Sequence, residues 1–330
     1  MEKLYSFSAV ELVAKLKNKE ITVSDLVNSV YDRIDEIEEK IGSYVSIVSR
    51  EKALESAKIS QAKYDNGTEG TLEGIPVAIK DNMVSDGERT SAASKILENY
   101  VGVYDAFVVK KLKEAGAIII GKANMDEFAM GSTTKTSAVK ETRNPWDLTR
   151  TPGGSSGGSA TAVASGEGIL SLGSDTGGSI RQPASFNGIV GLKPTYGRVS
   201  RYGLIAFASS LDQIGPMGKT VDDVALMFSA IEGYDEMDST SIKREKEDFL
   251  AEINDGIKGL RVGIPKEYFE YELKPEFKAL MDSSIEKFKE LGAEIVEVEL
   301  PHTKYAAPAY YIIAPAEASS NLARFDGIRY

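Results

Sequence analysis

Hydrophobic residues in the first part of the chain recur every three or four positions, a spacing that predicts helices. A helix packed on a core needs one apolar face. The helix expected to start at Thr22 has such a face, formed by Leu26, Val27, Val30, Ile34 and Ile37. We therefore expect a helical N-terminal region over 1–66 that packs on the rest of the chain.

Polar residues mark where these helices begin and end. Ser8 and Glu11 have the spacing of a capping box, in which two side chains satisfy each other's free backbone N–H groups. Thr22 and Asp25 have the same spacing at the start of the second helix. A third helix is expected over 51–65, because an Asn-Gly turn signal follows it directly.

After residue 66 the pattern changes to short apolar runs that alternate with helical segments. A helix that ends in glycine and is followed at once by a strand is typical of α/β proteins. We predict an α/β fold, a single domain overall, in which 67–330 form a twisted mixed β-sheet covered by α-helices on both faces. A charged stretch at 235–249 is expected to be a surface loop. The strands are predicted at 74–82, 117–124, 169–175, 260–265 and 293–301, and the helices at 104–116, 158–166, 219–233 and about 274–291.

Two stretches rich in glycine and serine, 153–159 and 175–184, do not have the surroundings of a flexible linker. They flank 160–174, a segment of mostly small and apolar residues that is expected to be buried. Glycines and hydroxyls in a core need a purpose other than flexibility. The sequence therefore directs attention to chemistry at this place.

Composition excludes several function classes. The 330 residues carry a net charge of −11, which argues against a broad face that binds a nucleic acid backbone, although a partner could still handle one. No apolar run approaches the roughly 20 residues that a membrane span needs. The N-terminus has no signal peptide pattern, so we expect a cytoplasmic protein.

The residue types present limit how a hydroxyl nucleophile could be activated. Cysteine is absent, which removes thiolate nucleophiles and thiolate metal sites, and the single histidine, His302, is expected on the surface. A neutral lysine is the main substitute for histidine as a general base. Lys80 ends the apolar strand 75–80, where burial would lower its pKa. The alternative is an ordinary strand-end lysine whose amine reaches water.

The glycines have a use if one of the serines attacks a carbonyl carbon. The backbone N–H groups of Thr176, Gly177, Gly178 and Ser179 could converge on a developing oxyanion, with Ser179 as the nucleophile. Hydroxyls of 153–159 could relay a proton between Ser179 and Lys80. Phosphate binding is disfavoured, because the Gly-Lys-Ser/Thr of a Walker A loop is missing.

A lysine that ends an apolar strand, then GGSSGGS, then DTGGSIRQPA, resembles the amidase signature family. Enzymes of this family use a Ser–Ser–Lys triad. The resemblance implies that Lys80 is the general base and that Ser155, on a cis peptide bond, is the bridging serine. It also implies that Ser179 forms the acyl intermediate and that the amides of 176–179 form the oxyanion hole.

Two further stretches, 124–138 and 143–160, are similar to the glutamine-hydrolysing chains of tRNA-dependent amidotransferases within that family. The resemblance implies that L-glutamine is hydrolysed here and that its ammonia converts Glu-tRNA(Gln) to Gln-tRNA(Gln). A B subunit would hold the charged tRNA and use ATP and Mg²⁺, and a C subunit would clasp the other two. No cofactor or metal is expected in this chain.

The same resemblance suggests substrate contacts at Gly131 and Ser132, and a weaker one at Tyr310. Members of the family are longer, so 67–330 is expected to be a core that lacks the family's C-terminal part, which holds further glutamine contacts. A stand-alone amidase acting on a small carboxamide is the alternative function, and a catalytically dead scaffold is a third. The stretch 124–131 favours the tRNA-dependent amidotransferase.

Overall fold

The computed structural model describes residues 3–245, 247–270, 272–326 and 328. Contacts within the chain divide it into two compact units. The first comprises 1–248 together with 316–330, and the second comprises 249–315. The N-terminal region 1–66 belongs to the first unit, and the region 67–330, expected as one core, is divided between the two units.

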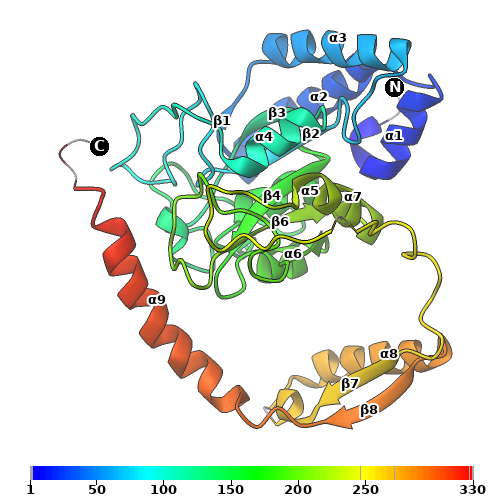
Figure 1. Ribbon diagram of the computed structural model, residues 1–330, viewed down its shortest axis with the longest axis vertical. Coiled ribbons are helices and arrows are strands. Elements are labelled where there is room, and N and C mark those ends of the chain that lie inside the picture. The colour runs from blue at the N-terminus through cyan, green and yellow to red at the C-terminus, as the bar shows by residue number, and fades with distance from the viewer. Residues whose placement is uncertain (1–2, 246, 271, 327, 329–330) are drawn as a thin grey trace. The chain divides into compact units, whose positions relative to one another are not determined.

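A mixed sheet forms the centre of the first unit, with helices flanking it (Figure 1). Within the described part of the chain it has the order β1-β3-β2-β4-β6-β5. The pair β2–β3 and the pair β2–β4 are parallel, and the outer pairs are antiparallel. The strands are β1 (Tyr44–Ile47), β2 (Pro76–Lys80), β3 (Ile118–Ala123), β4 (Leu170–Asp175), β5 (Val190–Gly191) and β6 (Gln213–Gly218).

Polar side chains cap the N-termini of four helices described in the first unit, α1, α2, α3 and α7. Ser8 and Glu11 form the expected capping box, as do Thr22 with Asp25, and Gly67 ends the third helix in a left-handed conformation. These predictions are confirmed. The helices are α1 (Ala9–Lys17), α2 (Val23–Ile41), α3 (Arg50–Asn66), α4 (Phe107–Glu114), α5 (Gly157–Ser165), α6 (Arg181–Asn187) and α7 (Val221–Ile231), with 3-10 turns at Leu4–Ser6 and Glu127–Ala129.

The second unit has a parallel two-stranded sheet whose strands are joined through a helix. The strands and the helix lie where the hydrophobic pattern predicts them. The elements are β7 (Arg261–Pro265), α8 (Pro275–Glu290) and β8 (Glu294–Val298), with 3-10 turns at Lys266–Phe269 and Thr303–Tyr305; α9 (Ala306–Leu322) follows. No helix in the described ranges is long and apolar enough to cross a membrane.

The sheet brings the two chemically interesting parts of the sequence together. Strands β2 and β4 are parallel neighbours, with Ile79 opposite Leu172. Their carboxyl ends therefore lie at the same edge of the sheet, a usual place for a site in α/β proteins. Both strands are buried along their whole length, so the residues at this edge project into the core.

Candidate active site

A fully buried lysine amine lies at the shared edge of β2 and β4. Lys80 has no exposed surface, and its Nζ lies within hydrogen-bonding distance of three hydroxyl oxygens. The distances are 2.7 Å to Ser155 Oγ, 2.9 Å to Ser156 Oγ and 2.9 Å to Ser174 Oγ. We call these three side chains the hydroxyl cluster. The prediction that Lys80 ends a strand buried on both faces is confirmed.

The hydroxyl cluster is part of a wider buried network. Ser156 Oγ donates to the carbonyl oxygen of Ser174 at 3.1 Å, and Asn82 Nδ2 donates to Ser174 Oγ at 3.0 Å. The Gly154–Ser155 peptide bond is cis. Gly173 leaves room for the Ser156 hydroxyl. A Cβ at position 173 would lie 2.9 Å from Ser156 Oγ, which is too close.

Burial controls the charge of the amine. Removal from water lowers the pKa of Lys80 to about 7, although the negative charges of Asp126, Asp175 and Asp212 oppose this effect. A lysine with this pKa is substantially neutral near pH 7 and has a lone pair available for a proton. The expected lowering of the Lys80 pKa by burial is therefore found.

The loop after β4 carries Ser179 and is held by Asp175. Burial raises the pKa of Asp175, but hydrogen bonds from Arg181 and from the Ile180 backbone outweigh it, and the net pKa is lowered. The resulting carboxylate accepts from the Gly178 N–H at 2.8 Å and from the Ile180 N–H at 3.0 Å. In the described structure the amide of Gly178 is thus engaged by Asp175 and does not face the site.

Two other amides of the same loop remain available. Within the ranges described, the N–H groups of Gly177 and Ser179 have no hydrogen-bond acceptor. Gly177 is exposed and Ser179 is half-buried, so a ligand can approach them from solvent. The carbonyl oxygen of Ser179 accepts from the Ser156 N–H at 3.2 Å, which ties this loop to the hydroxyl cluster. No hydrogen bond joins the side chains of Ser155 and Ser179 in this part of the chain.

Gln182 connects the segment before Ser155 to the segment that contains Gly131 and Ser132. Its Oε1 accepts from the Gly154 N–H at 2.9 Å, and its Nε2 donates to the Ser132 carbonyl oxygen at 3.2 Å. A Cβ at Gly131 would come within 2.4 Å of the Asp126 carboxyl group. Gly131 and Ser132 are exposed and lie in the same unit as Lys80.

The remaining sequence candidate, Tyr310, lies in α9 within the second unit, where its ring meets that of Tyr311 edge-on at 5.4 Å. His302 is exposed, as expected. Asp81 accepts hydrogen bonds from the Ser91 N–H and hydroxyl and lies 4.0 Å from Lys122 Nζ. It therefore does not stabilise the ammonium form of Lys80 by direct contact.

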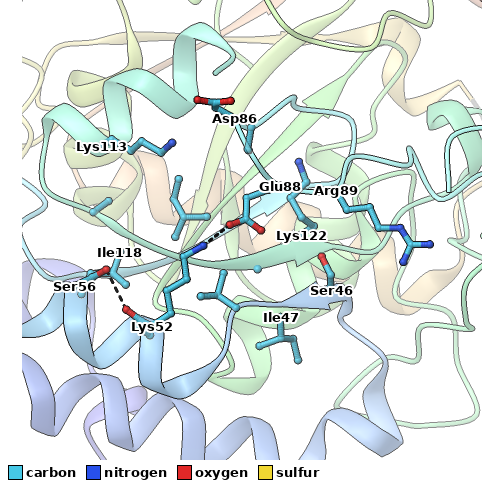
Figure 2. A pocket seen from close by; sticks show the side chains of 16 residues that line it. Ser46, Ile47, Lys52, Ser56, Asp86, Glu88, Arg89, Lys113, Ile118 and Lys122 are labelled. Carbon is cyan, nitrogen blue, oxygen red and sulfur yellow. Dashed lines mark hydrogen bonds and ion pairs between the residues drawn. The ribbon is translucent and has the colours of Figure 1, made fainter. Parts of the chain in front are cut away.

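A separate cavity of about 350 Å³ lies beside α3, β1 and β3 (Figure 2). Its lining includes Lys52, Glu88 and Lys122 but not Lys80, Ser155 or Ser179. Lys52 Nζ pairs with Glu88 at 2.7 Å in its lining, and the amine of Lys122 donates to Met83 O and Thr90 Oγ1. No cluster of three or more His, Cys, Asp or Glu side chains that could hold a metal occurs in the described ranges.

Ser174 and Asn82 were not predicted from the sequence as members of the network around Lys80, whereas Ser156 lies in the stretch 153–159 whose hydroxyls were expected to relay a proton. Ser174 is the second-last residue of a strand, and strand pairing was needed to find it. The register of β2 against β4 places Ser174 beside the end of β2. Asn82 follows Lys80 by two residues, and side chains two apart in a strand point to the same face. Because β2 ends at Lys80, this rule did not place Asn82 beside it.

Comparison with known proteins agrees with this geometry. The protein-family model "Amidase" matches residues 25–329. The chain belongs to the amidase family. This match includes Lys80 and both glycine- and serine-rich stretches, and it confirms the resemblance inferred from sequence.

Two curated members of the family that are similar to this chain carry the same name. The chain is 60% identical to the A subunit of the glutamyl-tRNA(Gln) amidotransferase of Fusobacterium nucleatum and 58% identical to that of Carboxydothermus hydrogenoformans. Each alignment covers 99% of this chain and 67% of the relative.

Solved structures of the family superpose closely. The crystal structure of the glutamyl-tRNA(Gln) amidotransferase A subunit from Thermotoga maritima matches with a TM-score of 0.85 at 46% identity, over 96% of this chain and 67% of that one. A peptide amidase from Stenotrophomonas maltophilia matches with a TM-score of 0.88 at 31% identity, over 97% and 67%. The predicted α/β fold with a mixed sheet between helices is therefore confirmed.

Proposed function

We propose that this chain is the glutamine-hydrolysing subunit of a tRNA-dependent amidotransferase and that it works through Lys80, Ser155 and Ser179. One observation carries the catalytic part: the buried amine of Lys80 lies 2.7 Å from Ser155 Oγ. With a pKa near 7 this amine can accept a proton at neutral pH. Identities of 55–60% to the corresponding chains of several bacterial amidotransferases support the choice of reaction.

In the proposed acylation step, Ser179 Oγ attacks the side-chain carboxamide carbon of glutamine. Its proton passes to Ser155, and the Ser155 proton passes to the Lys80 amine. The C–N bond then breaks, and a proton returning through Ser155 leaves with the nitrogen as ammonia. The products of this step are a glutamyl ester of Ser179 and free ammonia.

The developing oxyanion needs hydrogen-bond donors at the same place. The amides of Gly177 and Ser179 fit this role best, because neither has an acceptor within the described structure and both face accessible space. Removing one such donor typically costs about 2.7–4 kcal/mol of transition-state stabilisation. Water then attacks the ester by the same proton route in reverse, releasing glutamate.

Partners complete the proposed reaction. A B subunit would bind charged tRNA, activate the misattached glutamate of Glu-tRNA(Gln) with ATP and Mg²⁺, and receive the ammonia. A C subunit would hold the two larger subunits together in a heterotrimer. This division explains how an acidic chain can serve a tRNA-dependent reaction, since another subunit would contact the nucleic acid. The complex would act in the cytoplasm, where translation uses its product.

Ammonia release from L-glutamine tests the proposal, measured with and without B and C subunits and charged tRNA. We expect release that rises when the partners and charged tRNA are present, and a Ser179→Ala variant without acyl-enzyme. Accumulation of acyl-enzyme in that variant would place the nucleophile elsewhere.

A stand-alone amidase remains the second candidate, favoured by the close superposition on a peptide amidase. In that case small carboxamides would be hydrolysed at a rate that does not depend on partners. Lys80→Ala should lower either activity by several orders of magnitude, because the base acts in both proton transfers. Near-normal turnover in Lys80→Ala would reject the lysine as base for both candidates.

A further inference from the structure

Asn82 is buried beside the hydroxyl cluster and contacts only one of its members. It is 1% exposed, and its Nδ2 donates to Ser174 Oγ at 3.0 Å. Its backbone oxygen accepts from the Ile205 N–H at 2.8 Å, which fixes where the side chain begins. Its Oδ1 has no partner among the described residues. Burying an amide oxygen without a hydrogen-bond partner lowers the stability of the folded protein. An asparagine at this position therefore calls for a functional reason, and its hydrogen bond to Ser174 indicates where to look.

The Ser174 hydroxyl depends on Asn82 for its position. Within the described ranges, Ser174 Oγ has two hydrogen-bond partners, the Lys80 amine at 2.9 Å and Asn82 Nδ2 at 3.0 Å. A serine hydroxyl can adopt three staggered rotamers. Among the described residues, Asn82 is the one partner of this hydroxyl whose charge does not change when the Lys80 amine gains or loses a proton.

The other two hydroxyls are held differently. Ser156 Oγ donates to Ser174 O at 3.1 Å and accepts from Ser174 N at 3.3 Å, so backbone groups fix it without help from a side chain. Ser155 is the proposed proton carrier and must be free to exchange its hydrogen bond. Among the described residues, Ser174 is thus the member of the cluster whose hydroxyl is also held by a side chain other than Lys80, namely Asn82.

The contact matters because a neutral amine has one lone pair and two N–H groups. The lone pair faces Ser155 only if the two N–H groups have acceptors elsewhere. Ser156 uses its single proton on Ser174 O, so it serves as one acceptor. Ser174 Oγ, held at 2.9 Å, is the second and lies closer than the Ser174 carbonyl oxygen, which is 3.4 Å from the amine.

We propose that Asn82 is a positioning residue: by holding Ser174 Oγ as an acceptor for a Lys80 N–H, it leaves the amine's lone pair facing Ser155. This inference deepens the function proposed above and rests on its Lys80–Ser155–Ser179 route. Asn82 does not touch the substrate and acts only through Ser174.

A double-mutant cycle tests whether Asn82 acts through Ser174. The variants are Asn82→Ala, Ser174→Ala and the two combined. The readout is the rate at which a fluorophosphonate modifies Ser179, where an O–P bond forms, the P–F bond breaks and the proton goes to the base. Each single variant should slow labelling by roughly tenfold, and the double variant by about as much as the larger single effect. Rates that multiply in the double variant would overturn the proposal.

Titration of Lys80 gives a second readout that does not need catalysis. In protein with isotope-labelled lysine, the signal lost in Lys80→Met reports the pKa of this amine. Loss of an acceptor oxygen disfavours the ammonium, so Ser174→Ala and Asn82→Ala should both lower the Lys80 pKa. If Asn82 acted directly through its positive amide end, its removal would instead raise that pKa. An unchanged or raised Lys80 pKa in Asn82→Ala would therefore overturn the proposal.

The controls separate this inference from folding and from the proposed function. Asn28→Ala, on α2 and outside the network, should leave both readouts unchanged. Asn82→Leu keeps the branch at Cγ without a donor and replaces Asn82→Ala if that variant does not fold. Failure of the parent protein to be labelled at Ser179 would reject the proposed nucleophile, and the titration would still decide the role of Asn82.

Discussion

The charge of Lys80 results from a competition between burial and three nearby carboxyl groups. Its direct contacts are all hydroxyl or carbonyl oxygens, which cannot neutralise an ammonium as an ion pair would. Asp126 accepts from Thr133 and Thr136 of its own loop, and Asp175 pairs with Arg181 at 3.0 Å. Because these carboxylates have other donors, burial prevails and the amine stays near neutrality.

This balance predicts how acylation of Ser179 should depend on pH. The neutral amine is the active form, and its pKa is lowered to about 7. We therefore expect the rate of Ser179 modification to rise with pH and to level off above about 7. The measurement is the labelling rate with a fluorophosphonate over a series of buffers. A rate that falls as pH rises through this range would contradict a neutral lysine base.

At the scale of elements, α5 positions Ser155 and Ser156 by lying against the backbone that follows β3. The N–H of Gly158 donates to the Asn124 carbonyl oxygen at 3.0 Å. A Cβ at this position would lie 2.4 Å from Asn124 N and 2.4 Å from Ser43 O, both of them backbone atoms that cannot turn aside. Gly158 therefore permits the close packing that sets the start of α5.

Gly158→Ala should destabilise the protein although alanine favours helices. Overpacking of this kind costs about 1–3 kcal/mol, more than the gain in helix propensity of roughly 1 kcal/mol. The free energy of unfolding in urea measures the net effect. Gly168→Ala is the milder comparison, because its Cβ would meet the Tyr44 Oη at 3.3 Å, a contact that a small shift of the side chain relieves, and its nearest backbone atom at 3.5 Å. If the two variants were equally stable, α5 would be able to move away from Asn124 and Ser43, and the close packing at Gly158 would not be required.

Local signals account for the elements that the sequence predicts, and long-range pairing accounts for those it misses. Capping boxes and turn signals act between neighbouring residues, so the first three helices could be placed from sequence. Strand β6 contains Pro216 and two glycines, Gly215 and Gly218, which disfavour strands, and it forms because β4 pairs with it over five positions. Lys80 was predictable because the apolar run that it ends is a local signal. Ser174 became a candidate only once the pairing of β2 with β4 was known, because that pairing brings it near Lys80.

At the scale of the whole molecule, the stability of the first unit should depend on one carboxyl group far from Lys80 in the sequence. Glu167 is fully buried between α5 and β4, and its Oε2 accepts from Ser43 Oγ and Ser165 Oγ, both at 2.7 Å. Burial, with the nearby charge of Glu38 as a second cause, raises the pKa of Glu167 to about 8. Near neutral pH the folded protein therefore holds a proton there that the unfolded chain releases.

The sign of the effect follows from this difference. In the unfolded chain Glu167 titrates near its ordinary value of about 4.3, and in the folded protein it titrates at about 8. Its contribution to stability is complete below the lower value and is lost as pH rises to the upper one. We expect the melting temperature to fall over this window, and Glu167→Gln, which stays neutral, to reduce the fall.

A matched comparison isolates Glu167 from the other groups that titrate in the same window. Glu55→Gln makes the same chemical change at an exposed position on α3, so it should leave the slope of melting temperature against pH as it is in the parent. Glu167→Gln should flatten that slope because the amide can keep the Ser43 and Ser165 contacts without a proton to lose. If both variants fell as steeply as the parent, the buried carboxyl group would not be the origin of the dependence. Lys122 could not take its place as that origin, because burial lowers the pKa of Lys122 to about 8 and such a lysine adds stability as pH rises.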